Sequence, residues 1–362
     1  MKLDFELKYG ECFEVLKKYI NLPVVIAGYG VNARLFMGIM AELNISILAV
    51  CDKNKVGEQF EYLVSGKIKS YEYLKEIKEE YQIIIASEEH YDSIKSEVLK
   101  YVNGENVLAL DRVHEVRNLI PACYQLSEPF IYKRYLESNY NRLQKFERCI
   151  KDELSKKTLV NMIKTRLSWN EKYIKESCVE NMYFIDELQL GSDETLLDCG
   201  AFDGNTAVDF IRTVNGEFKK IYCVEPNPDN YEVIREKIEK YEGKIEMIGK
   251  GVSEQEGELF FSGEGSSYHI SLSGTKLEIT TIDDLKIEPS LIKMDIEGEE
   301  LKALKGAEQT IRKYRPKLAI CVYHKMEDLL DIEEWISGLN MGYRIMLRHH
   351  GKEINDTVLY AM

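Results

Sequence analysis

The chain has 362 residues, of which 44% are hydrophobic and 30% are charged, and such a composition is typical of a globular protein. A chain of this length is expected to form two or three domains rather than one core. Its formal net charge of -14 argues against non-specific nucleic-acid binding, which requires a basic surface. This charge still allows a small phosphorylated ligand in a local basic pocket.

The N-terminal stretch MKLDFELKYGECFEVL lacks the long apolar core of a signal peptide, and no stretch approaches the length of a membrane span. The eight cysteines are scattered, with no CxxC pair and no Cys/His cluster at zinc spacing. We therefore expect a cytoplasmic protein with reduced, buried thiols and no disulfide framework.

Residues 1–120 are predicted to form a Rossmann-like α/β domain. A helix is expected near residues 10–20. It is followed by a strand in LPVVIAGYG, a helix to about Leu43 and a strand in SILAVCDKN. QIIIAS and NVLAL predict further strands, and YDSIKSEVLKYV predicts a helix. Apolar strands that alternate with amphipathic helices indicate a parallel sheet covered on both faces.

The loop GYGVNA in this domain has the pattern of a phosphate-binding turn. Gly28, Gly30 and Ala33 match G-x-G-x-x-[GA] between a predicted strand and a predicted helix. The loop contains no acid, Arg34 follows it, and Asp52 ends the next strand, where an acid can bind a ribose. The region resembles Rossmann-like domains that bind nucleotide-sugars in some sugar-modifying transferases. We predict a second nucleotide site here; the alternative is a domain that serves only as a scaffold.

Residues 121–187 are predicted to form a helical bridge. IYKRYLESNYNRLQKFERCIKDEL places apolar residues at helical spacing among many charges of both signs. Because no flexible Gly/Ser linker interrupts the segment, we expect it to pack between two domains. A solvated helical spacer is the alternative.

Residues 188–362 contain seven candidate strands: TLLDCG, KIYCVEP, KIEMIGKGV, SLIKMDI, PKLAICVY, YRIMLRH and TVLYAM. The last two are joined by the hairpin-like turn HGKEIND. The sequence therefore predicts a second α/β domain whose parallel sheet closes with an antiparallel strand.

The turn after TLLD bears on the choice between two nucleotide ligands. Gly200 and Gly204 let the backbone approach a ligand. Glu225 ends the next strand, where an acid can bind both hydroxyls of an adenosine ribose. Asp198 and Asp203 would repel the pyrophosphate of NAD but suit the positive sulfonium and amino groups of S-adenosylmethionine (SAM). An ordinary strand-turn-helix with capping acids is the alternative.

Four motifs, LLDCGAFDGNTAVDF, IYCVEPNPDNYEVI, LIKMDIEGEELKALKGAEQTI and RPKLAICVYHKMEDL, together resemble the FkbM family of SAM-dependent methyltransferases. This resemblance runs from near Tyr183 to the C-terminus. It implies a seven-stranded class I methyltransferase sheet and O-methylation, often of sugars or glycosylated metabolites. It also implies that SAM is bound at its methionine end by Asp198, Gly200, Asp203 and Gly204, at its ribose by Glu225 and near its adenine by Gly251 and Val252.

Methyl transfer requires an aligned acceptor oxygen and a group that helps to remove its proton. Asp295 and Glu297 follow the fourth strand and could act as a base or hold a divalent ion. His324 follows the fifth strand and is the candidate general base, because an unperturbed histidine titrates near neutral pH. A histidine with a structural hydrogen bond is the alternative. Glu299 and Glu300 are expected to be only first-turn helix acids.

Two polar segments are candidates for acceptor binding. Ser267 and Tyr268 lie in GEGSSYHISL, and Arg348 lies in LRHHGKE. We predict that these side chains, with Glu297, contact the acceptor; solvated loops are the alternative.

The main hypothesis is therefore a cytoplasmic SAM-dependent O-methyltransferase that acts on a small-molecule or glycan acceptor, possibly a nucleotide-sugar. One alternative is a non-catalytic module that binds SAM or a nucleotide. Another is an NAD-dependent oxidoreductase with two Rossmann domains, although no Tyr-x-x-x-Lys in a matching context supports it.

Overall fold

The computed structural model describes residues 17–61, 65–87, 90–108, 129–168, 171–241, 243–262, 269–271, 275–352 and 354–362. The chain divides into two compact units, residues 1–139 with 163–170 and residues 140–162 with 171–362. The helical segment predicted over residues 121–187 is thus shared between the two units. Within the described ranges, no helix is long and apolar enough to cross a membrane.

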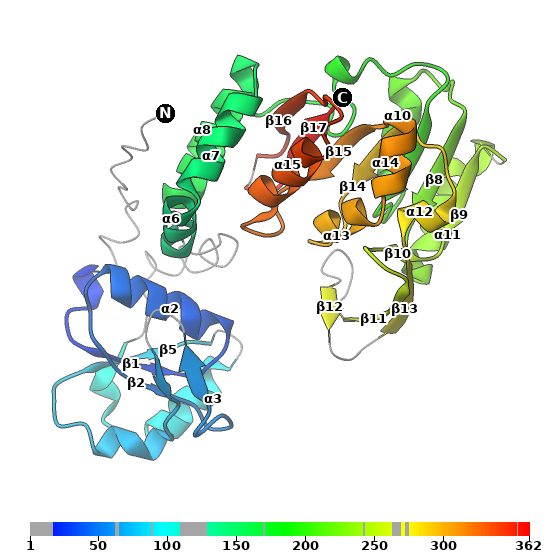
Figure 1. Cartoon of the computed structure of the whole chain (residues 1–362). Helices are drawn as coiled ribbons and strands as arrows, with labels where there is room; N and C mark the ends of the chain where they lie inside the picture. The colour runs from blue at the N-terminus through cyan, green and yellow to red at the C-terminus, as the bar shows by residue number, and fades with distance from the viewer. Residues whose placement is uncertain are drawn as a thin grey trace. The chain divides into compact units, whose positions relative to one another are not determined.

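The first unit contains a four-stranded parallel sheet in the order β2-β1-β5-β6 (Figure 1). Its central strand β1 is buried along its whole length, as expected for a parallel strand that is covered on both faces. The strands are β1 (Val24–Ala27), β2 (Ile47–Cys51), β5 (Gln82–Ile85) and β6 (Val107–Leu108), with a separate hairpin of β3 (Gln59–Glu61) and β4 (Ser65–Lys67). The helical elements are α2 (Val31–Glu42), η1 (Tyr71–Lys75), α3 (Tyr91–Val98), η2 (Gly104–Asn106) and α6 (Pro129–Ser138).

The second unit contains the predicted seven-stranded, mostly parallel sheet, in the order β16-β17-β15-β14-β7-β8-β9. The strands are β7 (Thr195–Cys199), β8 (Lys220–Val224), β9 (Ile245–Ile248), β14 (Leu291–Met294), β15 (Lys317–Cys321), β16 (Ile345–His349) and β17 (Thr357–Ala361). β17 pairs antiparallel with both β15 and β16. β7 and β14 are parallel neighbours, so their carboxyl ends lie at the same edge of the sheet.

A smaller sheet in this unit has the order β10-β13-β11-β12. Its strands are β10 (Gly251–Val252), β11 (Gly257–Ser262), β12 (His269–Ser271) and β13 (Thr275–Thr280). The stretch KIEMIGKGV, predicted as one strand, therefore forms two: β9 belongs to the large sheet, and β10 pairs with β13. As a result, Gly251 and Val252 do not end the third strand of the large sheet.

In the second unit, helices such as α10 and α14 lie against the large sheet (Figure 1). In α10, for example, Ala207, Phe210 and Ile211 are buried at the i, i+3, i+4 spacing of one helical face. The helices are α7 (Tyr140–Cys149), α9 (Lys172–Lys175), α10 (Asn205–Thr213), α11 (Tyr231–Ile238), α12 (Ile282–Leu285), α13 (Glu300–Lys305), α14 (Glu308–Tyr314) and α15 (Asp328–Gly338). Short 3-10 turns are η4 (Asp186–Leu188), η5 (Pro228–Asn230) and η6 (Glu239–Tyr241), and α8 (Glu153–Ser168) contributes residues to both units.

Candidate functional site

The turn after β7 requires glycine at position 200. Gly200 has a φ of +81°, and a Cβ atom on it would overlap the carbonyl oxygen of Asp295. The backbone of Asp295 is fixed on the same edge, because its N–H donates to the carbonyl oxygen of Cys199 at 3.1 Å. The glycine therefore lets the first turn of the site lie directly against the end of β14.

Lys293 in β14 stabilises the turn after β7 through two contacts. Its Nζ donates to the carbonyl oxygen of Gly200 at 2.7 Å and lies 3.0 Å from Oδ1 of Asp198. Both side chains are buried, at 2% and 0% exposure. Burial alone would lower the pKa of Lys293, but the carboxylates of Asp198 and Asp295 raise it. Asp198 thus forms a buried ion pair, and its charge is not free to face a ligand.

Asp203 is also paired, which weakens the charge argument made for it. Its Oδ2 lies 2.8 Å from Nζ of Lys237, and its Oδ1 accepts the N–H of Asn205 in the first turn of α10. This contact is close to the helix-capping alternative considered for the sequence, but Asp203 lies one residue before the N-cap. Gly204, with a φ of +78°, is the N-cap of the same helix and packs against Ile234.

A cavity of about 310 Å³ opens at the carboxyl ends of β7, β8 and β14. Six of the predicted residues line it, and Asp198, Asp203, Gly204 and His324 are not among the residues of its wall. The six are Gly200, Glu225, Gly251, Val252, Asp295 and Glu297. The structure thus brings these six residues together, whereas Asp198, Asp203 and Gly204 of the first glycine motif lie outside the cavity wall.

Glu225 follows β8 and is held in place by two backbone amides. Its Oε2 accepts the N–H of Phe202 at 2.9 Å, and its Oε1 accepts the N–H of Asn227 at 2.8 Å. The residue is 6% exposed, and burial raises the pKa of its carboxyl. Each oxygen has a further lone pair, so the carboxylate can still accept hydroxyl groups of a ligand in the cavity.

Asp295 follows β14 and receives two tyrosine hydroxyls. Tyr183 donates to its Oδ2 at 2.6 Å, and Tyr323 donates to its Oδ1 at 3.0 Å. Burial opposes the charge of Asp295, but His324, Lys293 and these hydroxyl groups together hold its pKa well below the usual range. The cavity wall therefore carries a fixed negative charge at this point.

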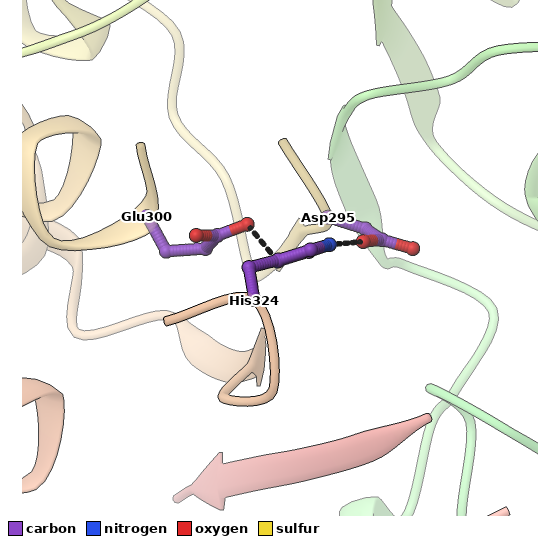
Figure 2. A group of neighbouring side chains, drawn as sticks. All are labelled: Asp295, Glu300 and His324. Carbon is purple, nitrogen blue, oxygen red and sulfur yellow. Dashed lines mark ion pairs between the residues drawn. The ribbon is translucent and has the colours of Figure 1, made fainter. Parts of the chain in front are cut away.

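His324 lies between two carboxylates (Figure 2). Its Nε2 is 3.3 Å from Oδ1 of Asp295, and its Nδ1 is 3.0 Å from Oε1 of Glu300. Burial alone would lower the pKa of His324, but the two carboxylates raise it to about 10. A histidine that stays protonated at neutral pH does not suit the general-base role predicted for it.

Of the four residues predicted to bind the acceptor, one lies in the cavity wall, one is buried in ion pairs, and two lie outside the described residues. Glu297 lines the cavity, with 53% of its side chain exposed. Ser267 and Tyr268 lie outside the described residues. Arg348 is only 3% exposed, and its guanidinium pairs with Asp152 at 2.9 Å and with Glu187 at 2.6 Å. This burial and pairing do not fit the predicted contact of Arg348 with an acceptor, and its role is to join β16 to other elements of its own unit.

Comparisons with known proteins agree with this arrangement. Residues 198–345 match the model of the methyltransferase FkbM domain family. The second unit carries a methyltransferase FkbM domain. The chain is also similar to the crystal structure of Methyltransferase FkbM from Methylobacillus flagellatus, with 24% identity, a TM-score of 0.60 and coverage of 99% of this chain and 96% of that one. This likeness shows that the two share a fold.

A curated relative is the Hexuronic acid methyltransferase AglP of Haloferax volcanii. It is 24% identical over 163 residues, which are 42% of this chain and 65% of the relative. The matched region thus spans less than two thirds of the length of that protein.

Several residues that line or support the site in the FkbM domain were not predicted from the sequence. Tyr183 lies outside the four motifs, and only the fold brings its hydroxyl to Asp295. Tyr323 directly precedes His324, so its place after β15 was a usable signal. Glu300 is predicted to be only a first-turn helix acid, and it does lie in the first turn of α13, but it is fully buried and faces His324. A lysine inside an apolar strand, Lys293, was the clearest unused signal, since buried lysines are almost always paired.

In the predicted nucleotide site of the first unit, the side chain of Asp52 is held by backbone amides. The carboxylate of Asp52 accepts the N–H of Tyr29 at 2.8 Å and that of Asn54 at 2.8 Å. Gly28 has a φ of +91°, Gly30 is the N-cap of α2, and Arg34 is exposed. The acid of the FkbM domain, Glu225, makes the same pair of contacts with its own loop and with the amide two residues on.

Proposed function

We propose that the protein is a SAM-dependent O-methyltransferase that acts on a sugar or glycosylated acceptor. The observation that carries the proposal is the cavity at the carboxyl ends of the strands, whose wall combines Glu225 with Asp295. Ligands of open α/β sheets bind at this edge. The methyltransferase FkbM domain match covers the same elements.

The residues of the cavity fit the parts of SAM. Glu225 would accept the ribose hydroxyls, and Val252, Leu277 and Ile279 offer an apolar wall for the adenine. The carboxylates of Glu225 and Glu297 favour a cationic ligand over a phosphate, whereas the charge of Asp295 is balanced by His324. The charge argument made for Asp198 and Asp203 is thus transferred to Glu225 and Glu297. When bound, SAM supplies an activated methyl group on a positively charged sulfur.

We propose that Asp295 orients the acceptor hydroxyl. It lies in the cavity wall, its pKa is low, and Tyr183 and Tyr323 fix its carboxylate by hydrogen bonds. Burial raises the pKa of Glu297, whose side chain is half exposed, so this carboxyl can take a proton from the site and pass it to solvent. His324 would support Asp295 rather than act as the base.

The sugar acceptor is inferred from the relative AglP, whose name states that it acts on a hexuronic acid. A hexuronic acid offers both hydroxyl and carboxylate oxygens to a methyl donor. A sugar hydroxyl remains the proposed acceptor for this chain, and the location of the protein in the cytoplasm also remains a prediction.

The test is calorimetry with SAM, followed by incubation with methyl-labelled SAM and a panel of methyl glucoside, methyl glucuronide and UDP-glucuronic acid. Binding of SAM and label in a base-stable product are the expected results. A label released by mild base would show a methyl ester and would overturn the hydroxyl assignment. Binding without any transfer would favour a non-catalytic module, and no binding at millimolar SAM would refute the proposal.

A further inference from the structure

We propose that Asp295, Glu300 and His324 hold a divalent metal ion at the wall of the cavity. One ligand atom from each residue lies within 4.8 Å of those of the other two. The three side chains come from different elements, since Asp295 follows β14, Glu300 begins α13 and His324 follows β15 (Figure 2). Asp295 and Glu300 belong to one acidic stretch, DIEGEE, and the fold brings His324 to it from a separate strand end.

One carboxylate oxygen of the cluster is left without a partner among the described residues. Within the described part of the chain, Oε2 of Glu300 is buried without a hydrogen-bond partner, whereas Nδ1 of His324 lies 3.0 Å from Oε1 of the same residue. Glu300 is 0% exposed, and its other oxygen, Oε1, accepts the N–H of Ile296 at 2.8 Å. A buried carboxylate oxygen without a partner is costly, and a cation is the group that compensates it most strongly.

The charge of the cluster also requires a cation. Two carboxylates face one imidazole, and either a proton on His324 or a metal ion can balance them. The nearby Lys293 acts on Asp295 only through space, because its direct contacts are with Asp198 and Gly200. Lys325 is engaged in the same way with Gly298 and Glu299.

One imidazole nitrogen and two carboxylate oxygens suit a first-row divalent ion such as Mn²⁺ or Zn²⁺ better than Ca²⁺ or Mg²⁺, which prefer oxygen ligands. Three protein ligands leave coordination positions for small molecules. Asp295 belongs to the cavity wall, so these positions can be reached from the cavity. If the proposed methyl transfer holds, the ion would lower the pKa of an acceptor hydroxyl there.

The experiment uses the full chain after treatment with a chelator and desalting. Mn²⁺ alone is titrated, and free Mn²⁺ is followed by electron paramagnetic resonance. The variants are Glu300→Gln, which keeps the shape of the side chain, and His324→Gln. The control is Glu308→Gln, which removes one negative charge from a half-exposed acid on α14 that pairs with Arg312.

We expect about one Mn²⁺ per chain for the wild type and the control, and affinity roughly 10- to 100-fold weaker for Glu300→Gln and His324→Gln. Absence of Mn²⁺ binding by the wild type at millimolar ion, or unchanged affinity in Glu300→Gln, would overturn the metal site and leave the proton on His324. Calorimetry with SAM on the same samples separates the two proposals. SAM binding without Mn²⁺ binding refutes only the metal site, and Mn²⁺ binding without SAM binding refutes only the proposed function.

Discussion

A Cβ atom on residue 200 would occupy the place of the carbonyl oxygen of Asp295. The glycine loop after β7 and the acid after β14 are therefore built against each other. Any change that separates them alters both the floor of the cavity and the position of its central carboxylate.

The variant Gly200→Ala tests this contact. Because the φ of +81° disfavours any side chain and the new Cβ meets backbone, we expect a loss of stability on the order of 2–4 kcal/mol together with weaker SAM binding. Urea unfolding and calorimetry measure the two effects. Gly191→Ala is the matched control, since a Cβ there meets nothing within 4 Å. Equal stability of the two variants would show that the loop moves freely.

Replacement of Glu225 by Gln should weaken SAM binding roughly 10- to 100-fold. The neutral amide loses the charge-assisted hydrogen bonds to the ribose, and its NH₂ group must face the N–H of either Phe202 or Asn227. Calorimetry measures the affinity, and Glu232→Gln on the exposed side of α11 is the control. Unchanged affinity would mean that Glu225 only holds the loop.

The sequence predicted the architecture better than the chemistry of the site. Uninterrupted apolar runs such as TLLDC reveal buried strands, and glycine next to an acid marks a ligand-binding edge. The partners of a charged residue are not visible in this way. Lys237 neutralises Asp203 from 34 residues away, and Asp295 with Glu300 reverses the charge state expected of His324. Such pairings depend on the packing of separate elements, and no local pattern encodes them.

Lys293→Met should destabilise the second unit by about 3–5 kcal/mol, because it leaves the carboxylate of Asp198 buried without its cation. The double variant Lys293→Met/Asp198→Asn should recover part of this loss, since the uncompensated charge is removed. Urea unfolding of the two single variants and the double variant measures the coupling. Lys220→Met, which breaks the more exposed pair with Glu246 and a long hydrogen bond to the carbonyl oxygen of Gly243, should cost no more than about 1 kcal/mol. Strict additivity would refute the coupling.

His350 should make stability fall as the pH decreases from about 6.5 to about 4. Burial, with Arg348 and His349 nearby, lowers the pKa of His350 to about 4. Its Nε2 faces the hydroxyl of Tyr360 at 2.8 Å, and that hydroxyl oxygen already accepts the N–H of Tyr183. The folded state therefore resists a proton that the unfolded state accepts, so the unfolded state gains in this pH range.

Urea unfolding of the wild type and His350→Gln between pH 7 and pH 4.5 tests this effect. The stability difference between the two should change by on the order of 2 kcal/mol over that range. The exposed His90 of the first unit, changed to Gln, is the control. Parallel pH profiles for the wild type and His350→Gln would contradict the prediction.

We also predict a nucleotide or nucleotide-sugar site at Gly28, Gly30, Arg34 and Asp52. Gly30 has a φ of −121°, and a Cβ on it meets nothing within 4 Å, so Gly30→Asp should fold normally. Its carboxylate should reduce nucleotide affinity by about 1–3 kcal/mol through repulsion of the phosphate. Calorimetry with UDP-glucose compares Gly30→Asp with Gly30→Ala, which adds the Cβ without charge. No heat with the wild type would identify the domain as a scaffold.

The pairing of β7 with β14 joins two segments that are far apart in the sequence, and this separation affects folding. The N–H of Thr195 donates to Oγ of Ser290 across 95 residues of chain. Closing so long a loop costs about 4 kcal/mol of entropy before the pairing returns any energy. Contacts between residues so far apart in the sequence slow folding. Until β14 pairs with it, the apolar strand β7 has one edge whose backbone N–H and C=O groups are unpaired. Aggregation during refolding should therefore start at β7, and it should depend more on protein concentration than on the final stability of the fold.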